Sequence, residues 1–351
     1  MNPLKIIKIL ICRGAFGKIY EPAWFRVLKG FGHDVSMLDI HEIIGKGPLG
    51  RLQEHYFTGP GVWKARRRLV EDVHSLNPDI TLLYQGHYFG PETIKKIKSN
   101  TFLTGYHNDD PFGGHGHLLR YRALKKALPL YDGFHVYRKC NVEEIKEAGV
   151  KNVALLMPYY IPWIDYPRAL KRKDKERYGC DIVFAGHPEQ DARIPCLGSA
   201  AHSGLKVRVF GYLPFWQKWL PTETPKRIQL ENVLPLNEYR IAICSAKISA
   251  CFFSKWNRDQ YTRRVFEIPA CGGFLLAERT PVMKDLYKEG KEAEYFESPE
   301  EFVDKAKHYI KHEAARKRIC IAGRKRLLRS GNDIYSRMKQ WVADVERWRH
   351  E

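Results

Sequence analysis

Residues 264–278 read RVFEIPACGGFLLAE, and this stretch decides the fold class of the 351-residue sequence. The pattern predicts a short helix over 264–270 and a buried strand over 274–276. Gly272 and Gly273 separate the two, and because they lack side chains the backbone there can approach a ligand closely. A helix, a glycine turn and a buried strand in this order are typical of an α/β domain.

Around this stretch, the second half of the chain alternates between strand and helix patterns, which predicts a parallel sheet. The expected strands cover residues 181–185, 206–210, 248–253 and 274–276, and the expected helices cover 192–202, 264–270, 299–311, 313–329 and 334–349. In the last helix, Trp341, Val345 and Trp348 fall on one face. We therefore expect the chain to end in an amphipathic helix.

The first half repeats the alternation. The expected strands cover 5–12, 35–40, 80–84, 102–106 and 133–137, and helical patterns lie between them at 24–31, 63–75, 91–99 and 117–128. Parallel strands joined by helices need right-handed crossovers. A proline-rich and charged stretch follows, typical of a linker. The sequence thus predicts an N-terminal domain (1–160), a hinge (161–179), a second domain (180–330) and a final helix (331–351).

Length and charge narrow the class of partner. A chain of this length suggests two domains, and 44% apolar residues exclude a disordered chain. Lys and Arg number 59 against 40 Asp and Glu, a net charge of +19, which predicts an anionic partner such as a nucleotide, nucleic acid or an anionic membrane. Residues 303–329 hold ten basic and two acidic side chains. This surplus of positive charge on predicted helices suits binding to anionic lipid headgroups. The alternative is that these side chains are simply solvated and bind no partner.

Several other partners and locations are disfavoured. No apolar run reaches transmembrane length, and the N-terminus lacks a signal-peptide pattern, so we expect a cytoplasmic protein, peripheral on the inner membrane face if the basic helices bind lipid. Nucleic-acid motifs and interleaved aromatics are missing from the basic stretches. The eight cysteines form no CxxC pair and are expected as free thiols. His115 and His117 lack further ligands at suitable spacing, so no metal is expected.

The 264–278 stretch resembles the signature of nucleotide-sugar glycosyltransferases with the GT-B fold. It is most similar to the CgeB-like branch, named for a spore-maturation protein, with the pattern R-x-F-E-x-x-A-C-G-G-x-x-L. The resemblance covers roughly residues 180–340. It implies an α/β fold of two Rossmann-like domains, with parallel sheets facing across a cleft and a C-terminal helix that crosses back to the N-terminal domain.

The resemblance also implies a site for the nucleotide-sugar donor. Glu267 would accept hydrogen bonds from the ribose, because a carboxylate offers two acceptor oxygens to a vicinal diol. Cations and backbone N–H groups suit the diphosphate. The donor site would comprise Glu267, Arg264, Arg193, Gly186, Gly272, Gly273, Asp259, Tyr212 and Lys255. Asp259 stands where related enzymes carry a second acid, Tyr212 could stack on the base or simply pack, and Arg263 is a further candidate cation.

The acceptor side is expected in the first domain. His107, Asp109 and Asp110 follow a predicted strand, where polar loops face a ligand, and they could bind an acceptor hydroxyl or take its proton. Alternatively, Asp110 before Pro111 only caps a turn. His87, Arg13 and Gly14 follow other strands and are expected to line the acceptor side.

Three functions remain open on the sequence. The first is metal-independent, cofactor-free transfer of a sugar from a UDP, GDP, ADP or TDP donor to a glycan, a lipid-linked acceptor or a lipopolysaccharide precursor, for which the resemblance favours retention. The second is a nucleotide-sugar epimerase of the same fold. The third is a non-catalytic basic module that binds nucleic acid or membrane. A nicotinamide dehydrogenase is disfavoured because the first strand is not followed by G-x-G-x-x-G.

Overall fold

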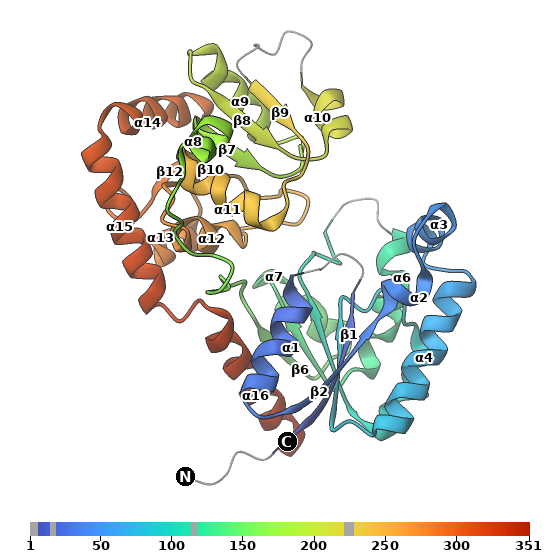
Figure 1. Ribbon diagram of the computed structural model, residues 1–351. Helices are drawn as coiled ribbons and strands as arrows, with labels where there is room; N and C mark the ends of the chain where they lie inside the picture. The colour runs from blue at the N-terminus through green and yellow to red at the C-terminus, as the bar shows by residue number, and fades with distance from the viewer. Residues whose placement is uncertain (1–5, 15–18, 114–117, 221–227) are drawn as a thin grey trace. The chain divides into compact units, whose positions relative to one another are not determined.

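The computed structural model describes residues 6–14, 19–113, 118–220 and 228–351, which form two compact units (Figure 1). Unit 1 comprises Met1–Met157 and Ile334–Glu351, and unit 2 comprises Pro158–Asp333. Each unit contains a six-stranded sheet with parallel pairing throughout. The predicted α/β class with two parallel sheets is confirmed.

The sheet of unit 1 has the strand order β2-β1-β3-β4-β5-β6. Its strands are β1 (Lys8–Arg13), β2 (Asp34–Asp39), β3 (Ile80–Tyr84), β4 (Phe102–His107), β5 (Gly133–Val136) and β6 (Asn152–Leu155). Every residue of β3 and β5 is buried, as expected for central parallel strands that helices cover on both faces.

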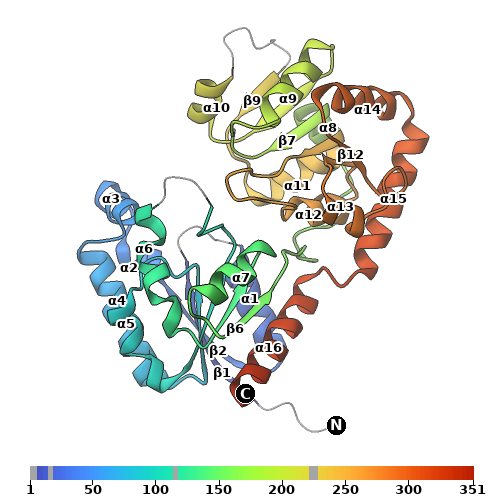
Figure 2. The ribbon, with the colours of Figure 1, turned by 180° about the vertical axis from the view of Figure 1, so that it is seen from behind.

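Helices cover the two faces of this sheet. The elements are α1 (Tyr20–Gly30), α2 (Ile40–Ile44), α3 (Pro48–Tyr56), α4 (Pro60–Leu76), α5 (Pro91–Lys95), α6 (Leu118–Ala127), α7 (Cys140–Glu147) and α16 (Ile334–His350), with 3-10 turns η1 (Lys98–Asn100) and η2 (Leu128–Leu130). α1 lies in front of the sheet in Figure 1, whereas α6 and α7 lie in front of it in Figure 2. Apolar residues of α4 to α7 share one core with β1 and β3 to β5.

The last helix of the chain, α16, belongs to unit 1 and packs beside α1. The rings of Trp24 and Trp341 lie 6.0 Å apart. A Cβ on Gly133 would lie 2.4 Å from the ring of Trp348, so β5 accepts this tryptophan because it carries glycine at that point. The buried ring of His135 also contacts α16, through Asp344 at 3.3 Å.

The sheet of unit 2 has the order β12-β11-β10-β7-β8-β9. Its strands are β7 (Cys180–Ala185), β8 (Val207–Phe210), β9 (Ile228–Glu231), β10 (Ala246–Cys251), β11 (Leu275–Glu278) and β12 (Glu294–Phe296). The helices are α8 (Arg172–Tyr178), α9 (Arg193–His202), α10 (Leu213–Trp219), α11 (Leu236–Ser245), α12 (Arg264–Ala270), α13 (Pro281–Leu286), α14 (Pro299–Lys311) and α15 (Glu313–Arg329). The segment predicted as a hinge lies in this unit and contains α8; its hinge role stays a prediction.

Three arginines of α15 each bind the end of another helix. Arg316 donates to the carbonyl of Tyr309 in α14 (2.6 Å). Arg324 donates to Ala270 O at the end of α12 (3.2 Å), and Arg326 donates to Leu286 O at the end of α13 (3.1 Å). The last carbonyls of a helix have no intrahelical partner and carry partial negative charge. Part of the basic surplus therefore holds unit 2 together.

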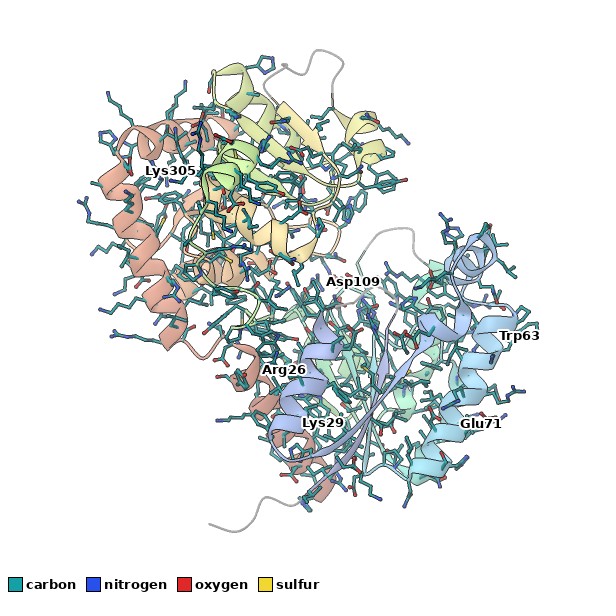
Figure 3. The ribbon with its side chains drawn as sticks, viewed as in Figure 1. Arg26, Lys29, Trp63, Glu71, Asp109 and Lys305 are labelled. Atoms are coloured by element: carbon teal, nitrogen blue, oxygen red, sulfur yellow. The ribbon has the colours of Figure 1, made fainter. Side chains whose placement is uncertain are left out.

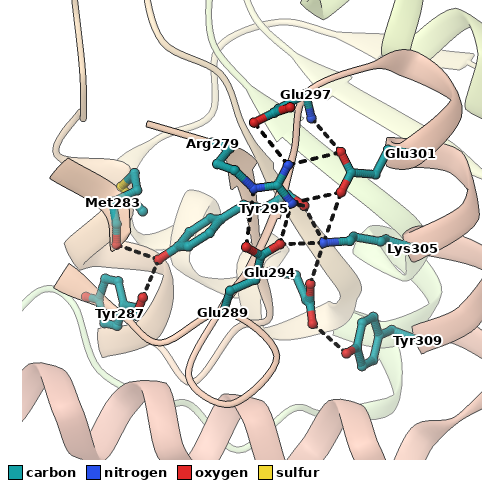
Figure 4. Close-up of polar contacts among 10 residues, drawn as sticks. All are labelled: Arg279, Met283, Tyr287, Glu289, Glu294, Tyr295, Glu297, Glu301, Lys305 and Tyr309. Carbon is teal, nitrogen blue, oxygen red and sulfur yellow. Dashed lines mark hydrogen bonds and ion pairs between the residues drawn. The ribbon is translucent and has the colours of Figure 1, made fainter. Parts of the chain in front are cut away.

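A second group of charges ties the loop after β11 to α14 (Figure 4). Arg279 pairs with Glu289 (2.5 Å) and Glu301 (2.8 Å). Lys305 pairs with Glu289 (2.7 Å) and with the buried Glu294 (2.8 Å). The hydrogen bond from Arg279 holds the pKa of Glu301 at about 2. Glu301 is therefore charged at neutral pH and takes part in the network as a carboxylate.

We expect Glu301→Gln to lower the free energy of unfolding by about 1–2 kcal/mol at pH 7, because it removes charged hydrogen bonds to Arg279. Since the folded-state pKa is depressed, this stabilisation is present above the unfolded value near 4.5 and is lost as the pH falls toward about 2. Urea unfolding from pH 7 down to acid checks this. The difference from wild type should shrink with falling pH, and Asp304→Asn, an exposed change on the same helix, should match wild type throughout.

Candidate functional site

The carboxyl ends of β7 and β10 mark the switch point of the unit 2 sheet. The strand order runs from β7 toward β8 and β9 on one side and from β10 toward β11 and β12 on the other. In open α/β sheets, ligands bind at such points. The loops that follow the two strands meet there, because the hydroxyl of Ser254 donates to Glu189 at 2.8 Å.

The loop after β7 begins with Gly186. Its carbonyl accepts a hydrogen bond from the indole of Trp216 (2.8 Å), and a Cβ there would lie 2.8 Å from the ring of Phe184 and 3.6 Å from Nη2 of Arg264. The guanidinium of Arg264 therefore lies beside Gly186. Burial, followed by the charges of Arg264 and Arg193, lowers the pKa of His187. The start of the loop thus lies beside the guanidinium of Arg264, a group that can bind an anion.

Arg193 holds the same loop from the first residue of α9. Its guanidinium pairs with Glu189 (2.8 Å) and Asp191 (3.2 Å) and donates to the carbonyl of His187 (2.8 Å). Both acids and the arginine come from one segment, and Arg193 is buried. Because two carboxylates already balance its charge, Arg193 shapes the loop, and Arg264 is the cation placed beside Gly186.

Glu267 lies in the first turn of α12 and is buried. Oε1 pairs with Arg263 at 2.6 Å, and Oε2 accepts a hydrogen bond from the hydroxyl of Tyr239 at 3.2 Å. Arg263 also pairs with Asp165 (2.8 Å) and donates to the carbonyl of Tyr159 (3.2 Å). Each carboxylate oxygen carries two lone pairs, so the orientation of Glu267 is held while acceptor capacity remains.

Asp165 and Tyr239 complete this site, and the sequence did not single them out. Burial raises the pKa of Asp165 to about 6 although Arg263 opposes the shift. Burial and the nearby charge of Glu267 raise the pKa of Tyr239 well above its usual value, so its hydroxyl stays protonated and can donate. Asp165 stands 98 positions before Arg263. No local pattern could have linked the two.

The glycine pair ends α12. Gly272 has φ +75°, and its N–H donates to Pro269 O (2.9 Å), while Gly273 N–H donates to Ile268 O (2.9 Å). A Cβ on Gly273 would lie 2.7 Å from the side chain of Ile243 in α11. These glycines therefore serve the left-handed helix end and close packing, and their contact with the donor stays a prediction.

The remaining predicted donor residues lie on neighbouring loops of unit 2. Lys255, after β10, pairs with Glu278 at the end of β11 (3.3 Å). The backbone N–H of Asp259 donates to Ser254 O (2.9 Å). Tyr212 follows β8 with its side chain 47% exposed, beside Phe215 at 52%. The two rings are perpendicular with centroids 4.9 Å apart, an exposed aromatic surface on which a base could stack.

In unit 1 the switch point lies between β1 and β3. Arg13, at the end of β1, pairs with Asp39 at the end of β2 (2.6 Å). Gly14 passes so close to β3 that a Cβ would lie 2.4 Å from Tyr84 O, and its carbonyl lies 2.9 Å from His41. The backbone of β1 can therefore reach this end of the sheet only with glycine at position 14.

Two buried histidines adjoin this point. His87 follows β3 and His107 ends β4, with ring centroids 4.9 Å apart, and Tyr121 contacts both rings. Burial lowers the pKa of His107 to about 4 and lowers that of His87, so both are neutral at pH 7. Within the described residues, neither nitrogen of His87 nor Nε2 of His107 has a hydrogen-bond partner. Such buried groups call for a ligand or water.

The two neighbouring aspartates differ in their surroundings. Oδ1 of buried Asp110 accepts hydrogen bonds from the backbone of Phe112 (2.9 Å) and Gly113 (2.9 Å) and from Asn141 (2.8 Å). This is the geometry of the capping alternative. The side chain of Asp109 is 27% exposed, 3.6 Å from Arg120, and Figure 3 places it where the strands of unit 1 end. Asp109 is thus the acid that a substrate could reach.

Glu21 is a further buried acid that the sequence did not single out. It lies in the first turn of α1, and neither carboxylate oxygen has a hydrogen-bond partner among the described residues. Burial raises its pKa to about 7. Across residues 6–14, 19–113, 118–220 and 228–351, no three His, Cys, Asp or Glu side chains cluster closely enough to hold a metal ion. His115 and His117 lie outside the described residues.

Known proteins share this architecture. Residues 193–343 match a family model described as glycosyl transferase-like. The structure of HepE from Anabaena in complex with UDP-glucose superposes with a TM-score of 0.69 at 11% identity, covering 97% of this chain and 100% of that one. The chain has the GT-B fold. Sucrose-phosphate synthase from Thermosynechococcus elongatus superposes with a TM-score of 0.71 at 11% identity, covering 97% of this chain and 99% of that one.

A third GT-B structure, the α,α-trehalose 6-phosphate synthase of Burkholderia multivorans, superposes with a TM-score of 0.62 at 11% identity, covering 98% of this chain and 99% of that one. No curated protein sequence matches the chain. The narrower resemblance to the CgeB-like branch stays a prediction. One fold hosts many activities, so the chemistry depends on the particular side chains of the site.

We expect Arg263→Met to cost about 3–5 kcal/mol of unfolding free energy, because it leaves two buried carboxylates without their cation. Urea unfolding measures this. Lys255→Met removes an exposed lysine and should cost about 0–1 kcal/mol. Adding Asp165→Asn to Arg263→Met should recover part of the loss; equal losses for Arg263→Met and Lys255→Met would contradict the buried ion pairs.

Proposed function

We propose that the protein is a glycosyltransferase that moves a sugar from a nucleotide-sugar donor to an acceptor, with the donor bound by unit 2. The observation that carries this proposal is the placement of Arg264 and Glu267 on one turn of α12. Arg264 lies beside Gly186 at the switch point, and Glu267 is held by Arg263 and Tyr239. One cation for a diphosphate and one oriented carboxylate for a ribose thus stand three positions apart.

The role proposed for Glu267 is to accept hydrogen bonds from the two ribose hydroxyls. A carboxylate suits this task only when its plane is held, and Arg263 and Tyr239 each bind one oxygen. Charged acceptors form stronger hydrogen bonds than neutral ones, so a neutral amide at this position would bind the donor less tightly. The buried Asp165 shares the arginine and thereby restrains it as well.

The role proposed for Arg264 is to stabilise the diphosphate as it leaves. Negative charge grows on the diphosphate while the bond to the sugar breaks, and a cation already in place stabilises that charge without reorganisation. Gly186 keeps space beside Arg264 because it has no side chain, and Arg193 fixes the loop through His187 O. Lys255 is a further candidate for the same anion.

The exposed rings of Tyr212 and Phe215 are proposed to receive the base. HepE from Anabaena has been solved with UDP-glucose and with UDP and glucose, so uracil is the first base to test, followed by the guanine, adenine and thymine nucleotides. In the retaining reaction that the family resemblance favours, Asp259 is the acid proposed to lie near the sugar.

Unit 1 is proposed to bind the acceptor, a glycan or a lipid-linked saccharide. The neutral His107 can hydrogen-bond a hydroxyl, and His87, Arg13 and Gly14 lie at the ends of adjoining strands. For an inverting reaction the base is Asp109, because Asp110 is occupied by three donors. The guanidinium of Arg120 lies 3.6 Å from this carboxylate and restrains its position.

Nucleotide binding tests the proposal. UDP, GDP, ADP or TDP should raise the melting temperature of the wild type, since a ligand that binds only the folded state stabilises it. Glu267→Gln should weaken binding of the stabilising nucleotide by about tenfold or more and abolish sugar transfer. Glu143→Gln, a change at an exposed residue, should alter neither nucleotide binding nor transfer. No stabilisation by any of the four, with salt-sensitive RNA binding instead, would contradict the proposal. Release of free sugar from the donor would indicate an epimerase.

The two aspartates of unit 1 give a paired test. Asp109→Asn should leave thermal unfolding near that of wild type but lower an inverting transfer by about 100-fold or more, because the base is lost. Asp110→Asn should lower thermal stability, since it weakens the turn to Phe112 and Gly113. Unchanged transfer by a folded Asp109→Asn variant would exclude Asp109 as the base.

A further inference from the structure

We propose that the outward face of α15 docks the protein onto an anionic lipid bilayer. This face, here called the α15 face, is made of residues spaced along one side of the helix: Lys317, Arg318, Ile321, Lys325, Leu328 and Arg329. All six are exposed, and Figure 3 shows side chains of α15 extending away from the rest of unit 2. No acidic residue lies among them.

The opposite side of α15 fixes which residues face outward. Ile319, Gly323 and Leu327 are buried, and a Cβ on Gly323 would lie 2.2 Å from Glu292 O. The helix therefore lies flush on unit 2. Because Arg316 and Arg324 also bind carbonyls of unit 2, α15 cannot rotate to bury its outward residues without breaking these contacts.

The cations of the α15 face differ from the other basic residues of this region. Arg316, Arg324 and Arg326 bind helix ends, and Lys305 lies among three carboxylates. Lys317 pairs with Glu313 (2.5 Å). In the described part of the chain, Arg318, Lys325 and Arg329 have no ion-pair partner. Three positive charges thus remain on one exposed side.

Two large aliphatic side chains lie among these charges. Ile321 is 70% exposed and Leu328 is 47% exposed, one above the other on the α15 face at i and i+7. Scattered exposed aliphatics are ordinary, but these two lie between arginine and lysine side chains, so both can enter the acyl boundary of a bilayer while the cations bind its headgroups. A nucleic acid would use only the cations, since the face has no aromatic ring for stacking.

None of the described helices is apolar over a length that could cross a bilayer. The docking surface is distinct from the residues proposed to bind donor and acceptor, so the inference does not depend on the transfer reaction. An anionic bilayer would nevertheless be the natural source of a lipid-linked acceptor.

Flotation of the full chain with vesicles tests the inference. The protein should bind vesicles of phosphatidylcholine with phosphatidylglycerol and not vesicles of phosphatidylcholine alone. The triple variant Arg318→Glu/Lys325→Glu/Arg329→Glu should lose binding by about 100-fold or more. A matched triple variant, Lys64→Glu/Lys173→Glu/Lys175→Glu, reverses three exposed lysines elsewhere and should bind within about threefold of wild type.

Ile321→Glu separates lipid docking from general attraction to polyanions. It should lower vesicle binding by about tenfold while leaving thermal unfolding and nucleotide stabilisation unchanged. Vesicle binding that survives both the α15 triple variant and Ile321→Glu would overturn the proposal. Loss of vesicle binding in the lysine control variant alone would also overturn it. So would RNA binding that is tighter than vesicle binding and that Ile321→Glu does not weaken.

Discussion

The ion pairs of Arg263 are the interaction on which unit 2 depends. One guanidinium serves two buried carboxylates, Asp165 near the start of the unit and Glu267 on α12. A buried charge without a partner is costly, so the segment that contains Asp165 must remain against α12. The same contact sets the plane of the Glu267 carboxylate. It also fixes the backbone at Arg263, directly before Arg264, the first residue of α12. Stability and the proposed donor site thus share one side chain.

The net charge of +19 divides into groups with different physical roles. Arginines of α15 bind the carbonyls of α12, α13 and α14, where the helix dipoles favour cations. Arg279 and Lys305 neutralise a cluster of glutamates (Figure 4), and Arg193 neutralises its own loop. The exposed cations of the α15 face are a small part of the surplus, and within α15 they are the ones that bind no carbonyl of a neighbouring helix.

Long elements with strong local signals could be predicted from the sequence. The bounds of α12, α14 and α15 agree with expectation. α14 begins at Pro299, directly after its N-cap Ser298, and a serine followed by proline is a helix start that can be recognised in a sequence. The short strands β6, β9 and β12 and the helices α2, α3, α7, α8, α10, α11 and α13 were not predicted. Segments this short carry too few periodic positions. Pairing with neighbouring strands decides the structure of the short strands, and tertiary packing stabilises the short helices.

The sequence by itself determined the alternation of strands and helices, the two parallel sheets and the positions of the polar loops after the strands, because these follow from local periodicity. Only the tertiary structure decided which polar side chains are already occupied. Asp110 accepts bonds from Asn141, Glu267 from Tyr239, and Asp165 lies 98 positions from its arginine. A side chain's chemistry depends on its neighbours in space, and the fold brings those neighbours from distant parts of the chain.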